Sequence, residues 1–368
     1  MLEDIMRALR DGDAAGALAA AARWAETEPA NPESLLWLAH AHAAARDVPA
    51  AASALDRALA LAPERADLLT ARAYLDLQAR DLDKATAGLD AALAQDPNQL
   101  PAYIALAQLA LLRRDPETAR RHLAYAKRLD DGHPRVLLLE AQLENAGRTT
   151  RGDADRALAL LSRAAERAPN DPLVVAGLGL AFLERGHHAF AAEALRRAIT
   201  LSGTASSLRG ALIVALEAQG HLDLALQEAE AWVAVQADAS LPRWHRGRLF
   251  ARLGHFAAAL PDVEAVQSAL PRHEAVFALA LQLHGQVGGK EAVLRALDAR
   301  IDADPTWFAP WRQLLSLVAA EQVPDVVRRW HAAAPDSGEA LEAAALLAER
   351  EGRAVDAQVL AANAIACE

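Results

Sequence analysis

Small apolar residues and prolines recur along the whole chain at a spacing close to 34 residues. The recurring prolines are Pro29, Pro63, Pro97, Pro169, Pro271, Pro305 and Pro335. When each of these prolines is counted as position 32 of a unit, position 20 is occupied by Ala17, Ala51, Ala85, Ala119, Ala157, Ala191, Ala225, Ala259, Val293 and Ala357. A period of this length indicates an array of short repeated structural units.

Each unit is predicted to form two helices. Position 8 is mostly small, as in Ala39, Ala73, Ala107, Ala141, Gly179, Gly247 and Ala345. Small residues at positions 8 and 20 fit a place where two helices cross closely, and proline fits a helix start or end. Glycine tolerates the positive φ that ends a helix. It stands at or beside position 15 in many units: Gly12, Gly147, Gly186, Gly220, Gly254, Gly288 and Gly352.

The period divides residues 1–368 into one continuous series of units. The predicted units are 1–31, 32–65, 66–99, 100–133, 134–171, 172–205, 206–239, 240–273, 274–307, 308–337 and 338–368. The spacing between prolines requires a four-residue insertion at 146–157 and a four-residue deletion at 319–330. Because one helix pair cannot bury its own apolar face, successive pairs are expected to stack.

This pattern resembles the tetratricopeptide repeat, whose units follow W-x2-L-G-x2-Y, then A-x3-F, alanine and proline. Residues 172–205 match with Leu178, Gly179, Phe182, Gly186, Ala191, Leu195 and Ala198. Residues 240–273 match with Gly247, Phe250, Gly254, Ala259, Val263 and Pro271. The resemblance covers essentially the entire chain. It implies an all-α fold, an α-solenoid in which antiparallel helix pairs stack into a right-handed superhelix and the first helices line a concave groove.

Composition agrees with an all-helical chain and narrows the classes of partner. Aromatic residues make up only 4% of the sequence, whereas alanine, the best helix former, is abundant. The net charge of −11 argues against a general nucleic-acid or anionic-membrane binder. The N-terminus has acids at positions 3 and 4 without a secretory h-region, and no uncharged apolar stretch approaches the roughly 18 residues of a membrane span. A cytoplasmic protein without membrane insertion is expected.

No motif of an enzyme or cofactor site stands out. The sequence contains no G-x-x-x-x-G-K-[ST], G-x-S-x-G, H-E-x-x-H or C-x-x-C. Its one cysteine, Cys367, excludes an intrachain disulfide. His40 and His42 point to different faces of a helix, which does not suit a metal site. The chain is therefore expected to be non-catalytic, with no cofactor and no metal.

The resemblance also predicts which side chains face the groove, because the family builds that surface from first-helix positions 2, 5, 6, 9, 12 and 13. In the N-terminal half these slots hold a mostly uncharged lining, which includes Leu36, Trp37, His40, Thr70, Tyr74, Gln78, Ile104, Gln108, Leu138, Gln142 and Asn145. In the C-terminal third they hold a cationic, amide-rich lining: Trp244, His245, Arg248, Arg252, Gln282, Gln286, Arg312 and Gln313.

Trp244, Arg248 and Arg252 are spaced four residues apart and share one helix face. Arginine binds carboxylates and phosphates bidentately and stacks on aromatic rings, so this ladder suits an anionic ligand. No acid lies between Asp238 and Asp262 in the sequence. The alternative is a solvated face whose arginines pair with acids from neighbouring units.

The partner expected from these features is a protein or peptide segment, acidic or not, bound by a non-catalytic scaffold. Two other roles are open: the recognition arm of a larger transferase- or hydroxylase-type enzyme, and an assembly factor for envelope or polysaccharide export. The last predicted helix still carries Val359, Leu360 and Ile365 without a polar cap. Terminal repeats normally have a polar outer face, so self-association through this helix is a further possibility.

Overall fold

The computed structural model describes residues 1–146, 151–202 and 206–367, and all regular structure in these residues is helical. The all-α prediction is therefore confirmed. The chain divides into two compact parts, Met1–Gly203 and Thr204–Glu368. The two parts are described separately below, and the expectation of one continuous array stays a prediction.

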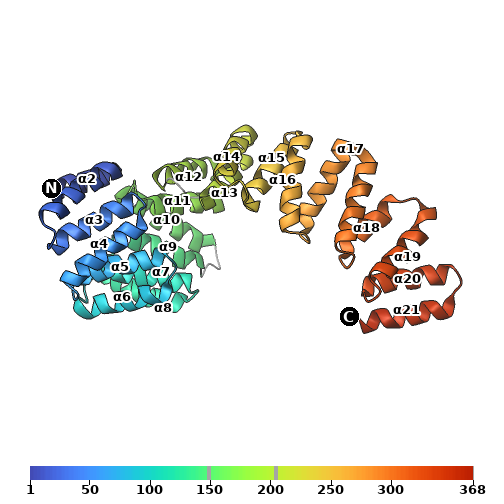
Figure 1. Ribbon diagram of the computed structural model, residues 1–368, viewed down its shortest axis with the longest axis horizontal. Helices are drawn as coiled ribbons and strands as arrows, with labels where there is room; N and C mark the ends of the chain where they lie inside the picture. The colour runs from blue at the N-terminus through green and yellow to red at the C-terminus, as the bar shows by residue number, and fades with distance from the viewer. Residues whose placement is uncertain (147–150, 203–205, 368) are drawn as a thin grey trace. The chain divides into compact units, whose positions relative to one another are not determined.

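The first part consists of helices that stack as successive antiparallel pairs (Figure 1). Their bounds are α1 Leu2–Asp11, α2 Ala14–Thr27, α3 Pro32–Ala44, α4 Val48–Leu61, α5 Ala66–Gln78, α6 Leu82–Gln95, α7 Leu100–Leu112, α8 Pro116–Leu129, α9 Pro134–Ala146, α10 Arg151–Arg167, α11 Pro172–Glu184 and α12 His188–Ser202. The first helices of four successive pairs begin 34 residues apart, at Pro32, Ala66, Leu100 and Pro134. Part of the predicted insertion at 146–157 lies outside the described residues.

The second part continues the same alternation. Its helices are α13 Ser206–Ala218, α14 Leu222–Val235, α15 Ser240–Arg252, α16 Phe256–Ala269, α17 Glu274–Ala303, α18 Phe308–Leu317, α19 Val323–Ala333, α20 Gly338–Arg350 and α21 Ala354–Ala366, with a short 3-10 turn at Ala320–Gln322. The long α17 is two helices joined at Gly289, whose φ of 65° and ψ of −163° are not helical. The α18 helix has ten residues where the first helices of most pairs have thirteen, and the predicted deletion follows it.

In most of the described pairs, the turn between the two helices places one residue at the positive φ of the left-handed conformation. Glycine occupies it at Gly12, Gly186, Gly220, Gly254 and Gly352, as the sequence predicts. In α17 the sequence placed the turn glycine at Gly288, which was wrong by one residue, because the positive φ belongs to Gly289. The predicted turn glycine Gly147 lies outside the described residues. Three units have arginine in this conformation instead, with φ of 64° at Arg46, 63° at Arg80 and 59° at Arg114.

The two helices of a pair cross where position 20 meets position 8. At position 20, side chains with at most 1% exposure are found at Ala17, Ala51, Ala85, Ala119, Ala157, Ala191, Ala225 and Ala259. At position 8 the contact leaves no room for a larger residue in two units. A Cβ atom on Gly247 would lie 2.9 Å from Cγ2 of Val263, and one on Gly179 would lie 2.9 Å from Cγ of Leu195. In these two units a residue without a Cβ atom at position 8 is therefore required by helix packing.

The second helices differ in how their first turns are capped. Asp13, Asp47, Asp81 and Asp115 each accept a hydrogen bond from a backbone N–H one turn into the helix, at 2.8, 3.0, 3.3 and 3.0 Å. Histidine holds the same slot before α14 and α16, and the side chains of His221 and His255 make no capping hydrogen bond. An aspartate cap contributes about 1 kcal/mol to the stability of a helix.

Replacing Arg80 by glycine should stabilise the protein. A non-glycine residue at φ of 63° bears a steric cost that glycine does not. We expect Arg80→Gly to raise the free energy of unfolding by about 0.5–1 kcal/mol, measured by urea denaturation. Arg80→Ala is the matched control, because it removes the same side chain and keeps the strain. If the alanine variant gained as much as the glycine variant, backbone strain would not be the cause.

Candidate functional site

In the first part, α3 presents an aromatic side chain and a histidine from the predicted set. Trp37 is half-buried and its Nε1 donates a hydrogen bond to Oε1 of Glu33 at 2.9 Å. The rings of Trp37 and His40 lie 5.4 Å apart. His40 is exposed to solvent, yet the surrounding protein desolvates its ring and lowers its pKa below the usual 6.5.

Two carboxylates near Trp37 and His40 were not among the predicted site residues. The guanidinium of Arg65 donates to Glu33 on α3 and to Asp67 on α5, the latter at 2.6 Å. These hydrogen bonds raise the pKa of Arg65, with that to Asp67 the stronger. Glu33 and Asp67 both stand at position 2, which was among the expected groove slots. The prediction of a mostly uncharged lining in this half did not include this ion-paired network, and it stays a prediction.

The remaining predicted residues of the first part are distributed over α5, α7 and α9. Tyr74 donates from its hydroxyl to the carbonyl oxygen of Pro101 at 3.1 Å, and burial raises its pKa to about 12. Gln78 and Gln142 are exposed, whereas Gln108 and Asn145 are half-buried. The residues at position 5 are buried and do not face a groove, contrary to prediction; they are Leu36, Thr70, Ile104 and Leu138.

In the second part, the two arginines of the predicted ladder converge on one carboxylate. Nη2 of Arg248 donates to Oε2 of Glu217, and Nη1 of Arg252 donates to Oε1 of the same residue at 2.7 Å. The Glu217 side chain is only 8% exposed, whereas Arg248 is 35% and Arg252 48% exposed. The acid that the local sequence lacked thus comes from α13, where Glu217 stands at position 12 of the preceding unit.

The structure changes the roles expected of His245 and Trp244. The prediction that His245 faces the groove was wrong: it is 9% exposed, and its ring lies 5.7 Å from that of Trp232. Burial lowers the pKa of His245, and the nearby charge of Arg248 lowers it further. Trp244 is half-buried against the core around Val263 and Leu283. Arg248 and Arg252 keep guanidinium N–H donors that a ligand could reach.

The amide-bearing positions further along the second part are open to solvent. Gln282 and Gln286 are exposed one turn apart on the first half of α17. Arg312 and Gln313 are exposed on α18, and the guanidinium of Arg312 lies 5.5 Å from the centre of the Phe308 ring. Their assignment as ligand contacts stays a prediction.

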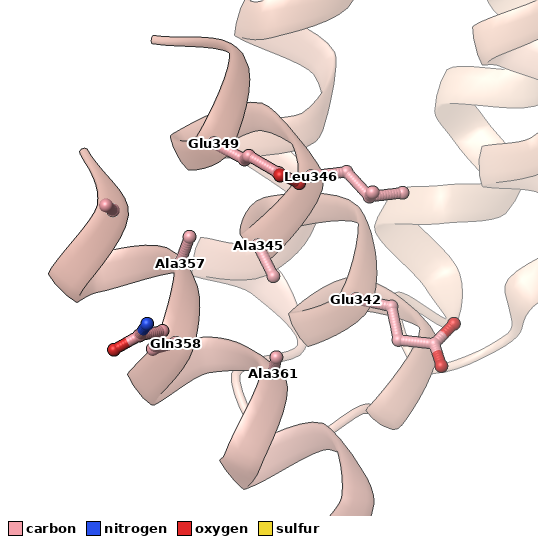
Figure 2. A pocket seen from close by; sticks show the side chains of 8 residues that line it. Glu342, Ala345, Leu346, Glu349, Ala357, Gln358 and Ala361 are labelled. Carbon is pink, nitrogen blue, oxygen red and sulfur yellow. The ribbon is translucent and has the colours of Figure 1, made fainter. Parts of the chain in front are cut away.

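A pocket of about 550 Å³ lies between α20 and α21. Figure 2 shows Glu342 and Leu346 on α20, with Ala357 and Ala361 on the facing side of α21. Leu346 is 63% exposed. Three apolar side chains of α21 are also exposed: Val355 by 74%, Val359 by 55% and Ile365 by 74%. Of the apolar residues that the sequence analysis named on this helix, Val359 and Ile365 are exposed, whereas Leu360 is half-buried.

The described residues also bear on two other kinds of site, a metal site and a membrane-spanning helix. No cluster of three or more histidine, cysteine, aspartate or glutamate side chains is arranged to hold a metal ion in residues 1–146, 151–202 and 206–367. In the same residues, no helix has the length and apolar character that crossing a membrane requires.

Comparison with known proteins finds similarity in structure alone. No family model matches the sequence, and no curated protein matches it. A chain of the APC/C hetero-tetramer Cut9–Hcn1 superposes with a TM-score of 0.61 and 14% identity, over 75% of this chain and 55% of that one. This chain therefore spans about half the length of that neighbour.

Smaller neighbours include a tetratricopeptide repeat protein from Parabacteroides merdae, with a TM-score of 0.45 and 18% identity over 67% of this chain and 96% of the other. A thermophilic tetratricopeptide repeat protein from Thermus thermophilus gives 0.43 and 22%, over 50% and 98%. The helix pair repeating every 34 residues, the small residues at its crossing and the similarity of fold together define the class. The chain has the all-α fold of stacked helix pairs that tetratricopeptide repeat arrays form.

The buried His245 should make stability depend on pH. Its folded-state pKa is lowered, so the unfolded chain takes up the proton first as the pH falls through about 6.5. The contribution of neutral His245 is therefore full above that pH and is lost below it. We expect the urea midpoint to fall between about pH 7.5 and about pH 5.5, and to fall less in His245→Gln. His221→Gln, which removes an exposed histidine, is the control; an equal change in both variants would contradict the assignment.

Proposed function

We propose that this protein is a non-catalytic interaction scaffold that binds a peptide or protein segment along its first helices, with Arg248 and Arg252 contacting acidic groups of that segment. Tetratricopeptide repeat proteins generally mediate protein or peptide binding. The observation that carries the more specific proposal is the convergence of two exposed arginines on one buried carboxylate.

The charges of this cluster do not cancel. Two guanidinium groups face a single carboxylate, so one positive charge remains at the surface. Each guanidinium has five N–H donors, and Glu217 accepts one hydrogen bond from each of them. Nε of Arg248 is buried and has no hydrogen-bond partner in the described structure. A ligand carboxylate beside the exposed edges of both arginines would gain charge-assisted hydrogen bonds without displacing Glu217.

The buried carboxylate also holds the two arginines in place. An exposed arginine loses considerable side-chain entropy when it binds a ligand. Arg248 and Arg252 are already oriented by Glu217, so less of that cost remains at binding. The Cut9–Hcn1 chain described above was solved within a hetero-tetramer, which agrees with a role in assembly but does not identify a ligand. Nothing in the described residues favours an enzyme's recognition arm or an envelope or polysaccharide export factor over the scaffold.

Removing the two arginines should weaken binding of an acidic peptide. The probe is a fluorescein-labelled peptide of alternating glutamate and leucine, followed by anisotropy at low and high salt. We expect Arg248→Gln/Arg252→Gln to bind about tenfold more weakly than the unmodified protein, and the difference to shrink as salt screens the charges. We expect Glu217→Gln to bind the probe more tightly, because it leaves both positive charges uncompensated.

A second cluster of similar composition supplies the control. Arg328 and Arg353 also share one carboxylate, that of Glu351, but each has a further acidic partner, Asp325 and Asp356 respectively. This cluster therefore carries no excess positive charge, and Arg328→Gln/Arg353→Gln should bind the probe as the unmodified protein does. Equal losses in the two double variants would show that net charge alone is responsible and would defeat the proposed site.

A second role is favoured by the exposed strip on α21. Val355, Val359 and Ile365 expose apolar surface on a helix of thirteen residues, next to the pocket of Figure 2. Exposed apolar patches of this kind mark interaction surfaces. We propose that a second copy of the chain covers this strip.

Association through α21 should depend on concentration and on its apolar residues. We expect sedimentation equilibrium to show a growing dimer fraction as the concentration of the unmodified protein rises. Val359→Glu should remain monomeric at concentrations where the unmodified protein dimerises, because pairing would bury its charge. Leu180→Glu, at an exposed leucine of the first part, is the control. A monomer throughout the range would refute self-association.

A further inference from the structure

A second cavity, of about 480 Å³, lies within the second part between α16 and the two halves of α17. Its volume falls in the range of small-molecule sites, roughly 300–1,000 Å³. The inner surface is apolar, with Phe277 and Ala280 contributing buried side chains. Small residues on the second half of α17, Ala292 and Ala296, leave the space open.

One wall of this cavity carries two arginines, Arg295 and Arg300, and the guanidinium of Arg300 lacks a carboxylate partner among the described residues. Arg300 forms no ion pair with any of the residues that the structure describes, and its Nε is buried without a hydrogen bond. Its guanidinium carbon lies 5.8 Å from the centre of the Trp307 ring. Arg295 lines the same wall and has only a distant contact of 3.9 Å with Glu291.

The acids nearest to Arg300 in the sequence are engaged elsewhere. Asp298 and Asp302 bind Arg329, at 2.6 and 3.2 Å. Asp304 binds Arg272 at 2.8 Å. A half-buried guanidinium with an unsatisfied N–H is costly, and the structure directs the available carboxylates to other arginines.

The opposite wall determines how a ligand would lie. Glu264 lines the cavity, and its carboxylate is 3.3 Å from Nε2 of His284. An anionic group would be repelled by Glu264 and attracted by Arg300 and Arg295. A ligand would thus lie with its charge against the arginine wall and its apolar body over Phe277 and Ala280.

We infer that this cavity binds a small organic anion, a carboxylate carried on an aromatic or aliphatic stem, with Arg300 as the anchor of the carboxylate. The carboxylate accepts hydrogen bonds from the guanidinium, whose central carbon stays near the Trp307 ring. The stem occupies the space that the alanines of α17 leave open. The site lies apart from Arg248 and Arg252, so it does not depend on the role proposed for them.

The test compares 4-phenylbutyrate with 4-phenylbutan-1-ol, which has the same stem without the charge, by isothermal titration calorimetry on the full chain. We expect the acid to bind about tenfold more tightly than the alcohol. Arg300→Met, which keeps an apolar stem over Trp307, should abolish that preference. Ala299→Leu, at an exposed residue lining the cavity, should weaken both ligands if its larger side chain fills the space.

The control is Arg128→Met. Arg128 also lies over an aromatic ring, 4.9 Å from the centre of Tyr125, but it belongs to the first part and does not line the cavity. This variant should keep the preference for the acid. Circular dichroism establishes that each variant is folded. Equal affinity of the unmodified protein for acid and alcohol, no binding of the acid up to roughly 10 mM, or an unchanged preference in Arg300→Met would each overturn the proposal.

Discussion

The close crossing of two helices within each unit is the constraint on which the rest of the structure depends. Alanines such as Ala51 and Ala85 are completely buried there, and Gly179 and Gly247 have no room for a Cβ atom. A larger residue would separate the helices and displace the surfaces that stack on the neighbouring pairs. Because each pair is stabilised by its neighbours, a local error at a crossing would be transmitted to the adjacent units.

How far the sequence predicts this protein depends on whether a feature is set by local geometry. The helix pairs and their turns follow from the positions of alanine, glycine and proline, because backbone sterics alone require small or flexible residues there. Even the exceptions obey the same geometry: Arg46 and Arg114 take the left-handed conformation because the turn requires it. The error at Gly288 arose because two adjacent glycines satisfy the turn equally well in sequence.

The candidate site was less predictable, because its charges come from different units. Arg248 and Arg252 could be recognised as a pair from their spacing, but their carboxylate lies 31 and 35 residues away, on another helix. His245 has the expected slot and is nevertheless buried, because the large ring of Trp232 packs over it. A repeat pattern specifies which way a helix position points on average; it does not specify the size and charge of the side chains opposite.

Arginine–carboxylate pairs about one repeat apart recur in both parts of the chain. Arg113 binds Asp83 and Arg185 binds Asp155 in the first part, and Arg272 binds Asp304 in the second. Exposed pairs contribute roughly 0–1 kcal/mol each, so their main effect is on which repeat units pack against each other.

The second helices also differ along the chain in how their first turns are capped. Since α14 and α16, on either side of the arginine-bearing α15, lack the aspartate caps of the earlier units, hydrogen exchange would begin at their first turns. These two helix starts should therefore open more readily than the aspartate-capped ones, and both belong to helices adjacent to α15 in the chain.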